Sequence, residues 1–279
     1  MSLHDALAAA SRFDPSGLAP LSLDGVVIGW IGSSVAAQLL RWPDVFTCTP
    51  RGIALTSAPP QARSDALAAV VRTLADEGLI RGWRNERYTI LSPASGEPLF
   101  ALERAAMRAF GLTARAAHLN GFVLDVSGWR MWIARRSHTK PIDPGKLDNL
   151  VGGGIAEGMN ARDTLIKECA EEAGIPVALA AQARNAGALR VNRTVPEGVH
   201  GEILYAYDLE LPAGFQPVNH DAEVAQFLLV TPAELVELIA AQKLTVDAAV
   251  VAIDFLARRG CLRSDPGLEL GIEALRVRS

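Results

Sequence analysis

VGGGIAEGMNARDTLIKECAEEAGI, residues 151–175, is the stretch that decides the fold of this chain. It opens with three consecutive glycines and continues into a run that carries both end signals of an α-helix. Asn160 can cap the start of that helix, and Gly174 followed by Pro176 signals its end. Between these signals apolar residues recur at helical spacing: Leu165, Ile166, Cys169, Ala170 and Ala173. The segment therefore predicts a glycine loop followed by a helix whose apolar stripe packs against a sheet.

The opposite face of this helix carries three glutamates, Glu168, Glu171 and Glu172. Their spacing places the carboxylates within one turn, where each pair repels by roughly 3 kcal/mol at roughly 6 Å and an effective dielectric near 20. No lysine on this face obviously relieves the repulsion. A divalent cation relieves it directly, because Mg2+ and Mn2+ prefer clustered carboxylates. The alternative interpretation is a solvated acidic turn, but the glycine loop before the helix and the stop signal after it favour a metal site.

This pattern resembles the motif of the Nudix hydrolases, G-x5-E-x7-R-E-U-x-E-E-x-G-U, in which U is a bulky aliphatic residue. The matching positions are Gly153, Glu168, Glu171, Glu172, Gly174 and Ile175. Two positions depart from the motif: Met159 stands where its first glutamate is expected, and Lys167 stands where its arginine is expected. The family's first glutamate generally supports the loop, so activity is expected to survive Met159. Lys167 keeps the positive charge but lacks the planar fork of arginine.

The resemblance implies a Mg2+-dependent (or Mn2+-dependent) hydrolase with Glu168, Glu171 and Glu172 as metal ligands and catalytic residues. A backbone carbonyl near Gly153 is expected to complete the metal site, because glycine lets the backbone approach an ion closely. Glu223, in the acidic segment HDAEVAQF, is a candidate catalytic residue, either as a distal ligand or as the general base. It can equally be a loop glutamate before a strand. The implied reaction is attack of water on a phosphorus of a diphosphate.

The length of 279 residues exceeds the size at which one hydrophobic core usually keeps growing, so two domains are expected. We place a smaller α+β domain at residues 1–115. The Nudix resemblance implies an α/β/α sandwich with a mixed sheet for residues 116–279, which gives an α/β class overall.

The order of predicted elements agrees with this division. The first half predicts helices at 3–13, 34–40, 62–77 and 99–110, strands at 26–31 and 88–91, and a hairpin at 45–55. The second half predicts strands at 119–126, 130–135, 188–194, 202–211 and 224–230, a turn at Ser127-Gly128, and helices at 232–241 and 245–259. Strands and helices in this order suit a mixed sheet with helices on both faces.

Charge and cysteine content narrow the class of partner. A net charge of −4 without a long basic run argues against nucleic-acid binding. Three scattered cysteines, Cys48, Cys169 and Cys261, fit neither a disulfide framework nor a zinc site, which indicates a reducing, cytoplasmic setting. The apolar stretch 18–40 is broken by Asp24, Gly25 and two serines, so no membrane span is expected. The expected partner is a small-molecule diphosphate, and no oligomeric state is predicted.

Several segments outside the motif narrow the resemblance further: WRNE at 83–86, ERAAMRAFG at 103–111, HLNG at 118–121, WIARRSHTKPIDPGKLDN at 132–149 and ILYAYDLELP at 203–212. Together they are similar to the Nudix group related to thiamine pyrophosphokinases, which carries an uncharacterised (DUF4743-like) N-terminal domain. This implies hydrolysis of thiamine diphosphate or its oxidised analogues to the monophosphate and phosphate. Two alternatives stay open: an ADP-ribose or ADP-sugar type pyrophosphatase, and a ligand-binding module that has kept the fold and lost the chemistry.

Six residues are candidates for substrate binding: Arg135, Arg136, Lys146, Trp83, His118 and Asn120. The three basic side chains, and Lys140 beside them, can meet phosphate oxygens, but each can also be a solvated strand end. Trp83 can stack on a heteroaromatic ring, as can Trp132, although a single tryptophan is more often part of a core. His118 and Asn120 can contact substrate, and a hydrogen-bonded structural histidine is the competing interpretation.

Overall fold

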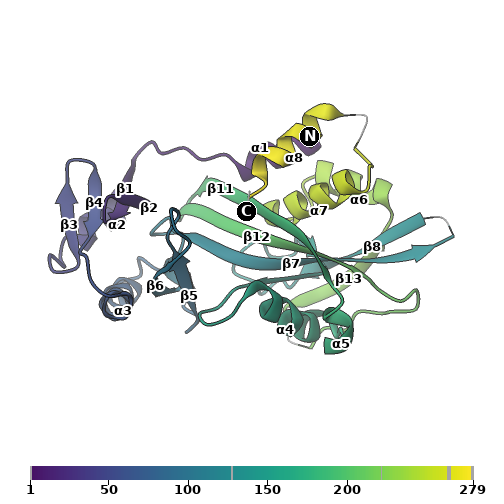
Figure 1. The fold of residues 1–279 in the computed structure, drawn as a ribbon, viewed down its shortest axis with the longest axis horizontal. Coiled ribbons are helices and arrows are strands. Elements are labelled where there is room, and N and C mark those ends of the chain that lie inside the picture. The colour runs from purple at the N-terminus through teal and green to yellow at the C-terminus, as the bar shows by residue number, and fades with distance from the viewer. Residues whose placement is uncertain (1, 127, 221, 263–264, 278–279) are drawn as a thin grey trace.

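The computed structural model describes residues 2–126, 128–220, 222–262 and 265–277, which form two lobes (Figure 1). The larger lobe is built on a seven-stranded sheet in which β11, β12, β7, β8 and β13 are neighbours in that order. β12 pairs with β7 in parallel and the other pairs are antiparallel, so the sheet is mixed. Its strands are β7 (Thr113–Asp125), β8 (Gly128–Arg136), β9 (Leu147–Asn149), β10 (Val151–Gly154), β11 (Arg184–Val195), β12 (Gly198–Glu210) and β13 (Val224–Val230).

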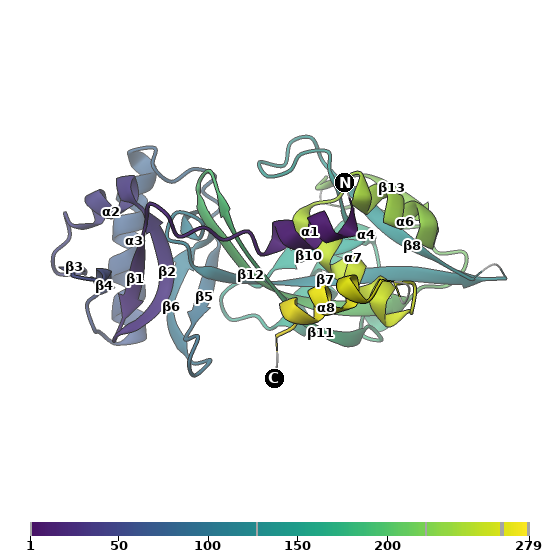
Figure 2. The same cartoon turned by 90° about the horizontal axis from the view of Figure 1, so that it is seen from above.

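Helices cover both faces of this sheet (Figures 1 and 2). One face packs against α4 (Ala161–Ala173) and α5 (Val177–Ala180), and the other against α6 (Pro232–Ala240) and α7 (Val246–Arg258). The side chains of β7 divide between the two cores, since successive residues of a strand point to opposite faces. Leu119 and Val123 join the core under α4, whereas Phe122 packs on Phe255 of α7. The α/β/α sandwich expected for the second half of the chain is confirmed.

The smaller lobe, residues 18–112, has its own hydrophobic core. Its sheet has the strand order β2-β1-β4-β3, and a separate hairpin joins β5 to β6. The elements are β1 (Leu18–Leu23), β2 (Val26–Gly32), α2 (Ser33–Leu39), β3 (Phe46–Thr49), β4 (Gly52–Leu55), α3 (Pro60–Asp76), β5 (Arg87–Leu91), β6 (Pro98–Glu103) and the 3-10 turn η1 (Arg104–Ala106). The hairpin expected at 45–55 is present as β3 and β4.

The helix predicted at 99–110 is wrong, because its first half is strand β6. Phe100 and Leu102 are buried in the core of the smaller lobe, and β6 pairs with β5 along its length. The Ala101 N–H donates to the hydroxyl of Ser64 on α3. These tertiary contacts outweigh the helical preference of an alanine-rich sequence.

Helix α1 (Leu3–Ala10) lies against the larger lobe, although its sequence precedes the smaller one. Leu3 and Leu7 enter the core that α7 and α8 (Pro266–Leu275) share, and Figure 2 shows α1 beside these two helices. The first residues of the chain therefore complete the core of the second half. The predicted turn at Ser127-Gly128 includes Ser127, which lies outside the described residues. Among the described residues, no helix has both the length and the apolar character needed to cross a bilayer.

Candidate active site

Helix α4 begins and ends where the sequence predicts. The Asn160 side chain accepts a hydrogen bond from the Asp163 N–H at 2.9 Å, which satisfies one of the free donors of the first turn. Gly174 ends the helix with φ of +62°, a left-handed conformation that glycine adopts without steric cost. Leu165, Cys169 and the residues around them bury one face against the sheet. The opposite face is thereby fixed relative to strand β10.

The glycines of β10 allow α4 and the smaller lobe to approach the sheet closely. A Cβ atom on Gly153 would lie 2.4 Å from Cγ of Glu168, and one on Gly154 would overlap the hydroxyl of Tyr88. Any side chain at these two positions would therefore force the side chain of Glu168 or Tyr88 to move. The glycine run forms strand β10, paired with β7, rather than the loop that the sequence predicts, and its glycines serve close packing.

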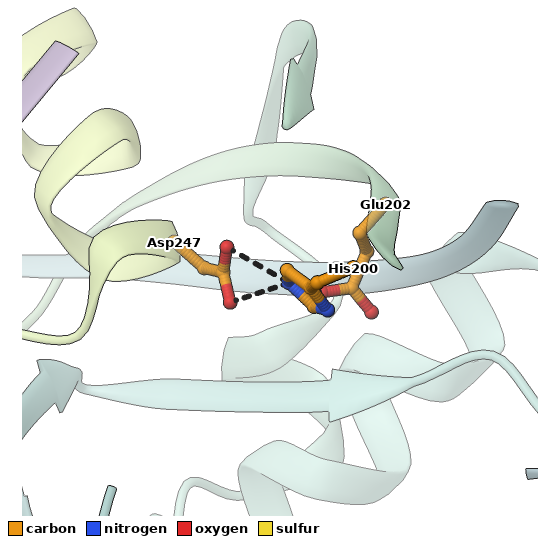
Figure 3. A group of neighbouring side chains, drawn as sticks. All are labelled: His200, Glu202 and Asp247. Carbon is orange, nitrogen blue, oxygen red and sulfur yellow. Dashed lines mark hydrogen bonds and ion pairs between the residues drawn. The ribbon is translucent and has the colours of Figure 1, made fainter. Parts of the chain in front are cut away.

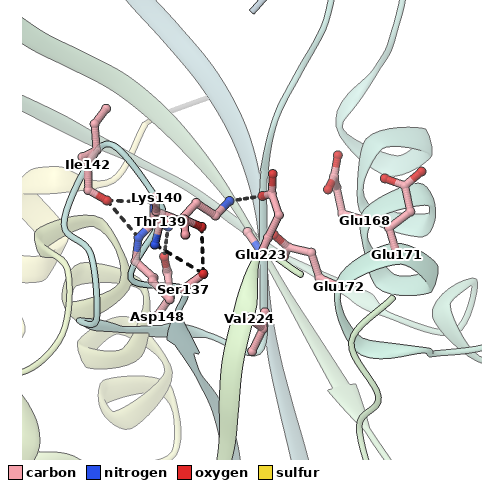
Figure 4. A network of polar contacts seen from close by, with 12 residues as sticks. Ser137, Thr139, Lys140, Ile142, Asp148, Glu168, Glu171, Glu172, Glu223 and Val224 are labelled. Atoms are coloured by element: carbon pink, nitrogen blue, oxygen red, sulfur yellow. Dashed lines mark hydrogen bonds and ion pairs between the residues drawn. The ribbon is translucent and has the colours of Figure 1, made fainter. Parts of the chain in front are cut away.

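Glu172 is the most buried of the three motif glutamates, by which we mean Glu168, Glu171 and Glu172 (Figure 4). Its Oε2 atom accepts a hydrogen bond of 3.0 Å from the N–H of Gly152. Burial raises the pKa of this carboxyl to about 8, and the negative charge of Glu168 adds to the rise, while the Gly152 N–H opposes it. In the absence of a bound metal ion, burial thus favours the protonated form of Glu172, and the nearby Lys140 opposes that effect.

Lys167 contacts the other two motif glutamates, contrary to the expectation that no lysine relieves their repulsion. Its Nζ atom lies 3.1 Å from Oε1 of Glu168 and 2.6 Å from Oε2 of Glu171. Although burial alone lowers the pKa of Lys167, the hydrogen bonds to both carboxylates raise it above its ordinary value. The lysine thus supplies the positive charge that the motif's arginine would otherwise supply at this position.

Glu223 lies beside Glu172, where strand β13 begins (Figure 4). It forms an ion pair with Lys140, and both residues border the same small hollow as Glu172 and Gly152. Burial lowers the pKa of Lys140. Asp221 of the same acidic segment lies outside the described residues. The tertiary structure therefore brings Glu223 to the motif from a strand that follows it by some fifty residues in the sequence.

The motif glutamates and Glu223 are a donor set of carboxylate oxygens, which is the type that Mg2+ and Mn2+ prefer. The Glu172 carboxylate is buried and receives a single hydrogen bond from the described residues, so it has acceptor capacity left for an ion. The close packing of Glu168 on Gly153 keeps a second carboxylate at the same strand. The donor chemistry of these residues fits a divalent cation, although the ligand atoms of the motif glutamates are not gathered within 4.8 Å of one another.

A cleft of about 620 Å3 lies between the two lobes and reaches the glycine strand. The smaller lobe contributes Tyr88, Arg104 and Arg108 to its lining, and the larger lobe contributes β10 and residues of β7, β12 and α7. Its volume is in the range of small-molecule sites. Guanidinium groups on its wall suit an anionic ligand. Arg104 and Arg108 stand in the segment predicted as a helix at 99–110, whose sequence carries no signal of a binding role.

Two of the predicted substrate residues, Arg136 and His118, line this cleft. Arg136 donates to Asp148 at 2.8 Å and to the carbonyl of Ile142, which fixes its guanidinium at the cleft wall. His118 is buried, with Nδ1 at 2.8 Å from Oδ1 of Asn149. Their positions agree with a part in ligand binding.

Trp83 and Asn120 lie away from the cleft. Trp83 packs against the core of the smaller lobe, and its Nε1 donates to Asn85 at 2.7 Å. Asn120 is fully buried and donates to Asp208 at 3.0 Å. Neither residue lines the cleft, so the structure gives a substrate-binding role for them no support.

Arg135 and Lys146 also point elsewhere. The Arg135 guanidinium donates to the carbonyl of Gly145 at 3.0 Å, because alternate residues of β8 face opposite sides of the sheet. Lys146 pairs with Asp143 at 3.2 Å. Of the neighbouring basic residues, Arg136 is the one that faces the cleft.

Comparison with known proteins shows the family of the chain. Residues 116–251 match the family model described as NUDIX domain, and residues 2–114 match a domain of unknown function, DUF4743. A curated relative, "Nudix hydrolase 24, chloroplastic" of Arabidopsis thaliana, is 35% identical over 254 residues, which cover 89% of this chain and 70% of the relative. The chain belongs to the Nudix hydrolase family. It is therefore a hydrolase with the fold and motif helix of that family.

A second Nudix relative, "Nudix hydrolase 20, chloroplastic" of the same plant, is 34% identical over 258 residues, which cover 88% of this chain and 69% of the relative. A solved structure, DR0079 of Deinococcus radiodurans, is 22% identical with a TM-score of 0.46 and covers 62% of this chain and 98% of its own. The matches to both plant relatives extend across the two lobes, so these relatives also combine the Nudix domain with the N-terminal domain.

Proposed function

We propose that this Nudix hydrolase cleaves the diphosphate of thiamine diphosphate, or of its oxidised analogues, to the monophosphate and phosphate. The observation that carries the proposal is the cleft between the lobes, which joins the glycine strand of the motif to a wall with arginine and aromatic side chains. Arg104, Arg108 and Arg136 supply donors for a diphosphate. Tyr88 and Met107 offer a surface for a compact heteroaromatic ring.

Water supplies the attacking oxygen in the proposed reaction. Its oxygen bonds to the terminal phosphorus, the bond from that phosphorus to the bridging oxygen breaks, and the thiamine monophosphate leaves. Glu223 stands beside Glu172 at the motif, and we assign it the role of accepting the proton of the attacking water. Lys140 pairs with Glu223 and holds its carboxylate beside the motif.

Glu168, Glu171 and Glu172 are the proposed ligands of Mg2+. When bound, the ion polarises phosphate oxygens and makes water more acidic. The chain's own contribution is to hold the three carboxylates on one helical turn, with Glu172 anchored on the Gly152 N–H. Proton loss from Glu172 is part of forming the site, because its pKa is raised by burial.

The cleft volume also admits a nucleoside diphosphate joined to a sugar, so ADP-ribose is the competing substrate. A panel of thiamine diphosphate, an oxidised thiamine diphosphate, ADP-ribose and ADP-glucose separates the two. We expect kcat/KM for a thiamine-type compound to exceed that for ADP-ribose by about tenfold or more. A panel in which ADP-ribose is the best substrate overturns the proposed specificity.

The same panel is run with Mg2+, with Mn2+ and with a chelator. We expect product release with either ion and none with the chelator, because the carboxylate site then lacks its cation. Absence of hydrolysis for every compound with both ions would assign the chain to the non-catalytic ligand-binding class.

A further inference from the structure

A second group of ligand-type side chains lies at the far wall of the cleft, away from the motif glutamates. It consists of His200, Glu202 and Asp247, which we call the distal cluster (Figure 3). Nε2 of His200 lies 3.1 Å and 3.2 Å from the two carboxylate oxygens of Asp247, and 3.6 Å from Oε2 of Glu202. Among the described residues, this is the group whose ligand atoms all lie within 4.8 Å of one another, and the motif glutamates do not form such a group.

Two separate elements build the distal cluster. His200 and Glu202 are two residues apart on β12, so their side chains share the face of the sheet that α7 covers. Thr245 caps α7 by accepting from the Ala248 N–H, which places Asp247 in the first turn above that face. The three side chains are 11%, 14% and 18% exposed, in the order of their numbers. They are thus held by rigid elements and open only to the cleft.

The distal cluster carries more negative than positive charge. Even with a protonated imidazole, two carboxylates face one cation. Within the part of the chain that the structure describes, the Glu202 carboxylate accepts no hydrogen bond, and its ion pair is the 3.6 Å contact with His200. Burying such a carboxylate is costly unless a cation compensates it.

The nearest arginines of the cleft wall are already engaged. Arg104 pairs with Glu86 at 2.6 Å, and Arg108 lies 3.7 Å from Glu197. Arg104 acts on Glu202 and Arg193 acts on Asp247 through longer-range attraction, but among the described residues neither arginine forms a hydrogen bond or ion pair with the distal cluster.

We propose that His200, Glu202 and Asp247 bind a divalent transition-metal ion of the Zn2+ or Co2+ type, at a site separate from the motif glutamates. Such ions bind imidazole nitrogen and carboxylate oxygen at about 2.0–2.2 Å, so neighbouring ligand atoms are separated by roughly 3–3.5 Å. The observed separations of 3.1, 3.2 and 3.6 Å fall close to that range. One imidazole with two carboxylates suits these ions better than Mg2+, which prefers oxygen donors and retained waters.

The ion would replace the proton on Nε2 of His200 and bind three protein atoms from one side. Its remaining positions face the cleft, because all three residues line that cavity. The site is thus open to water or to a donor atom of a molecule in the cleft. The inference does not depend on which diphosphate the enzyme cleaves.

Cobalt absorption tests the site in the full-length chain. Purified protein is first stripped with a chelator and saturated with Mg2+, so that the motif glutamates are occupied, and is then titrated with Co2+. We expect one equivalent of Co2+ to bind with a visible absorption band, and a competing equivalent of Zn2+ to remove the band. Failure of the wild-type protein to bind Co2+ under these conditions overturns the proposal.

Near-isosteric variants locate the bound ion. We expect Glu202→Gln and Asp247→Asn each to weaken Co2+ binding by about tenfold or more, because each removes one of three ligands. The matched control is a Glu168→Gln, Glu171→Gln double variant, which is expected to keep the band. Near-UV circular dichroism confirms that each variant is folded. Binding unchanged in the two distal variants, or lost in the motif control, overturns the assignment.

Discussion

The motif glutamates and the distal cluster are two acidic groups on one mixed sheet, and they differ in how the chain assembles them. The motif glutamates come from one turn of α4, so local spacing alone places them at neighbouring positions of one helix. The distal cluster combines a strand and a helix that are separated in the sequence, so the tertiary fold alone brings it together. The motif glutamates can therefore be predicted from their helical spacing in the sequence, whereas the distal cluster cannot.

The two groups also differ in their neutralising partners. Lys167 pairs with two motif glutamates and Lys140 pairs with Glu223, so lysines surround the first group. The distal cluster has an imidazole as its basic member. Flexible lysines can move aside for a metal ion, whereas an imidazole can become a ligand itself. The difference predicts that a metal ion at the motif is bound by oxygen atoms alone, and that an ion at the distal cluster is bound by one nitrogen and by carboxylate oxygens.

The largest expected effect is the loss of hydrolysis in Glu172→Gln. The variant keeps the shape of the side chain and its hydrogen bond to Gly152 but removes the charge. We expect kcat with Mg2+ to fall on the order of a thousandfold. Steady-state phosphate release measures the effect, with Glu237→Gln on the exposed face of α6 as control. Unchanged turnover in Glu172→Gln would remove the motif glutamates from the active site.

The second prediction concerns the stability of the metal-free protein. Burial raises the folded-state pKa of Glu172 from 4.5 to about 8, so ionisation of this carboxyl opposes folding. The contribution of Glu172 to the stability of the folded protein is fully present below its unfolded-state pKa of 4.5. It is lost as the pH rises through the folded-state pKa of about 8. We expect Glu172→Gln to be more stable than the wild type at pH values near 8, by up to a few kcal/mol at about 1.4 kcal/mol per pKa unit.

Urea unfolding in chelator across this pH range measures that difference. The gap between the two proteins should shrink toward acidic pH, where Glu172 is protonated in both the folded and the unfolded state. A gap that does not change with pH would contradict the raised pKa.

The third prediction concerns the wall that the smaller lobe supplies. Arg108→Gln removes one cation from the cleft, and the ion pair with Glu197 that it breaks is loose, at 3.7 Å. We expect KM for the diphosphate to rise about tenfold, with a smaller change in kcat. Arg72→Gln on the exposed face of α3 is the matched control, since Arg72 pairs with Asp76 outside the cleft. Equal KM values in the two variants would exclude the smaller lobe from substrate binding.

The smallest effect is expected for Lys167→Gln. Its ion pairs are half exposed, and such pairs contribute about 1 kcal/mol or less. Removal leaves Glu168 and Glu171 to repel each other, so the loss of Tm should be visible in chelator and shrink when Mg2+ is added. Thermal unfolding with and without Mg2+ measures this. A loss that is identical under the two conditions would show that the cation does not relieve this pair.

The prediction of α4 succeeded because its signals are local. Asn160 and Gly174 act on the turn in which they stand, and the three glutamates share a face by spacing alone. The segment around Phe100 and Leu102 was assigned to a helix because its propensity is helical, and the partner strand β5 that overrides it is not visible as such in a sequence. Among the candidate binding residues, Arg136 faces the cleft whereas Arg135 beside it does not, a choice that only the pairing of β8 makes.

By itself, the sequence determined the motif helix, its limits and the shared face of its carboxylates, since these follow from periodicity and end signals. The sandwich around the helix was implied by the resemblance that the motif carries. Only the tertiary structure decided that Glu223 and Lys140 lie beside Glu172, that the smaller lobe closes the cleft with Arg104 and Arg108, and that His200, Glu202 and Asp247 meet. Contacts between distant segments depend on how sheet and helices pack, and that packing is set by the whole core rather than by any one stretch.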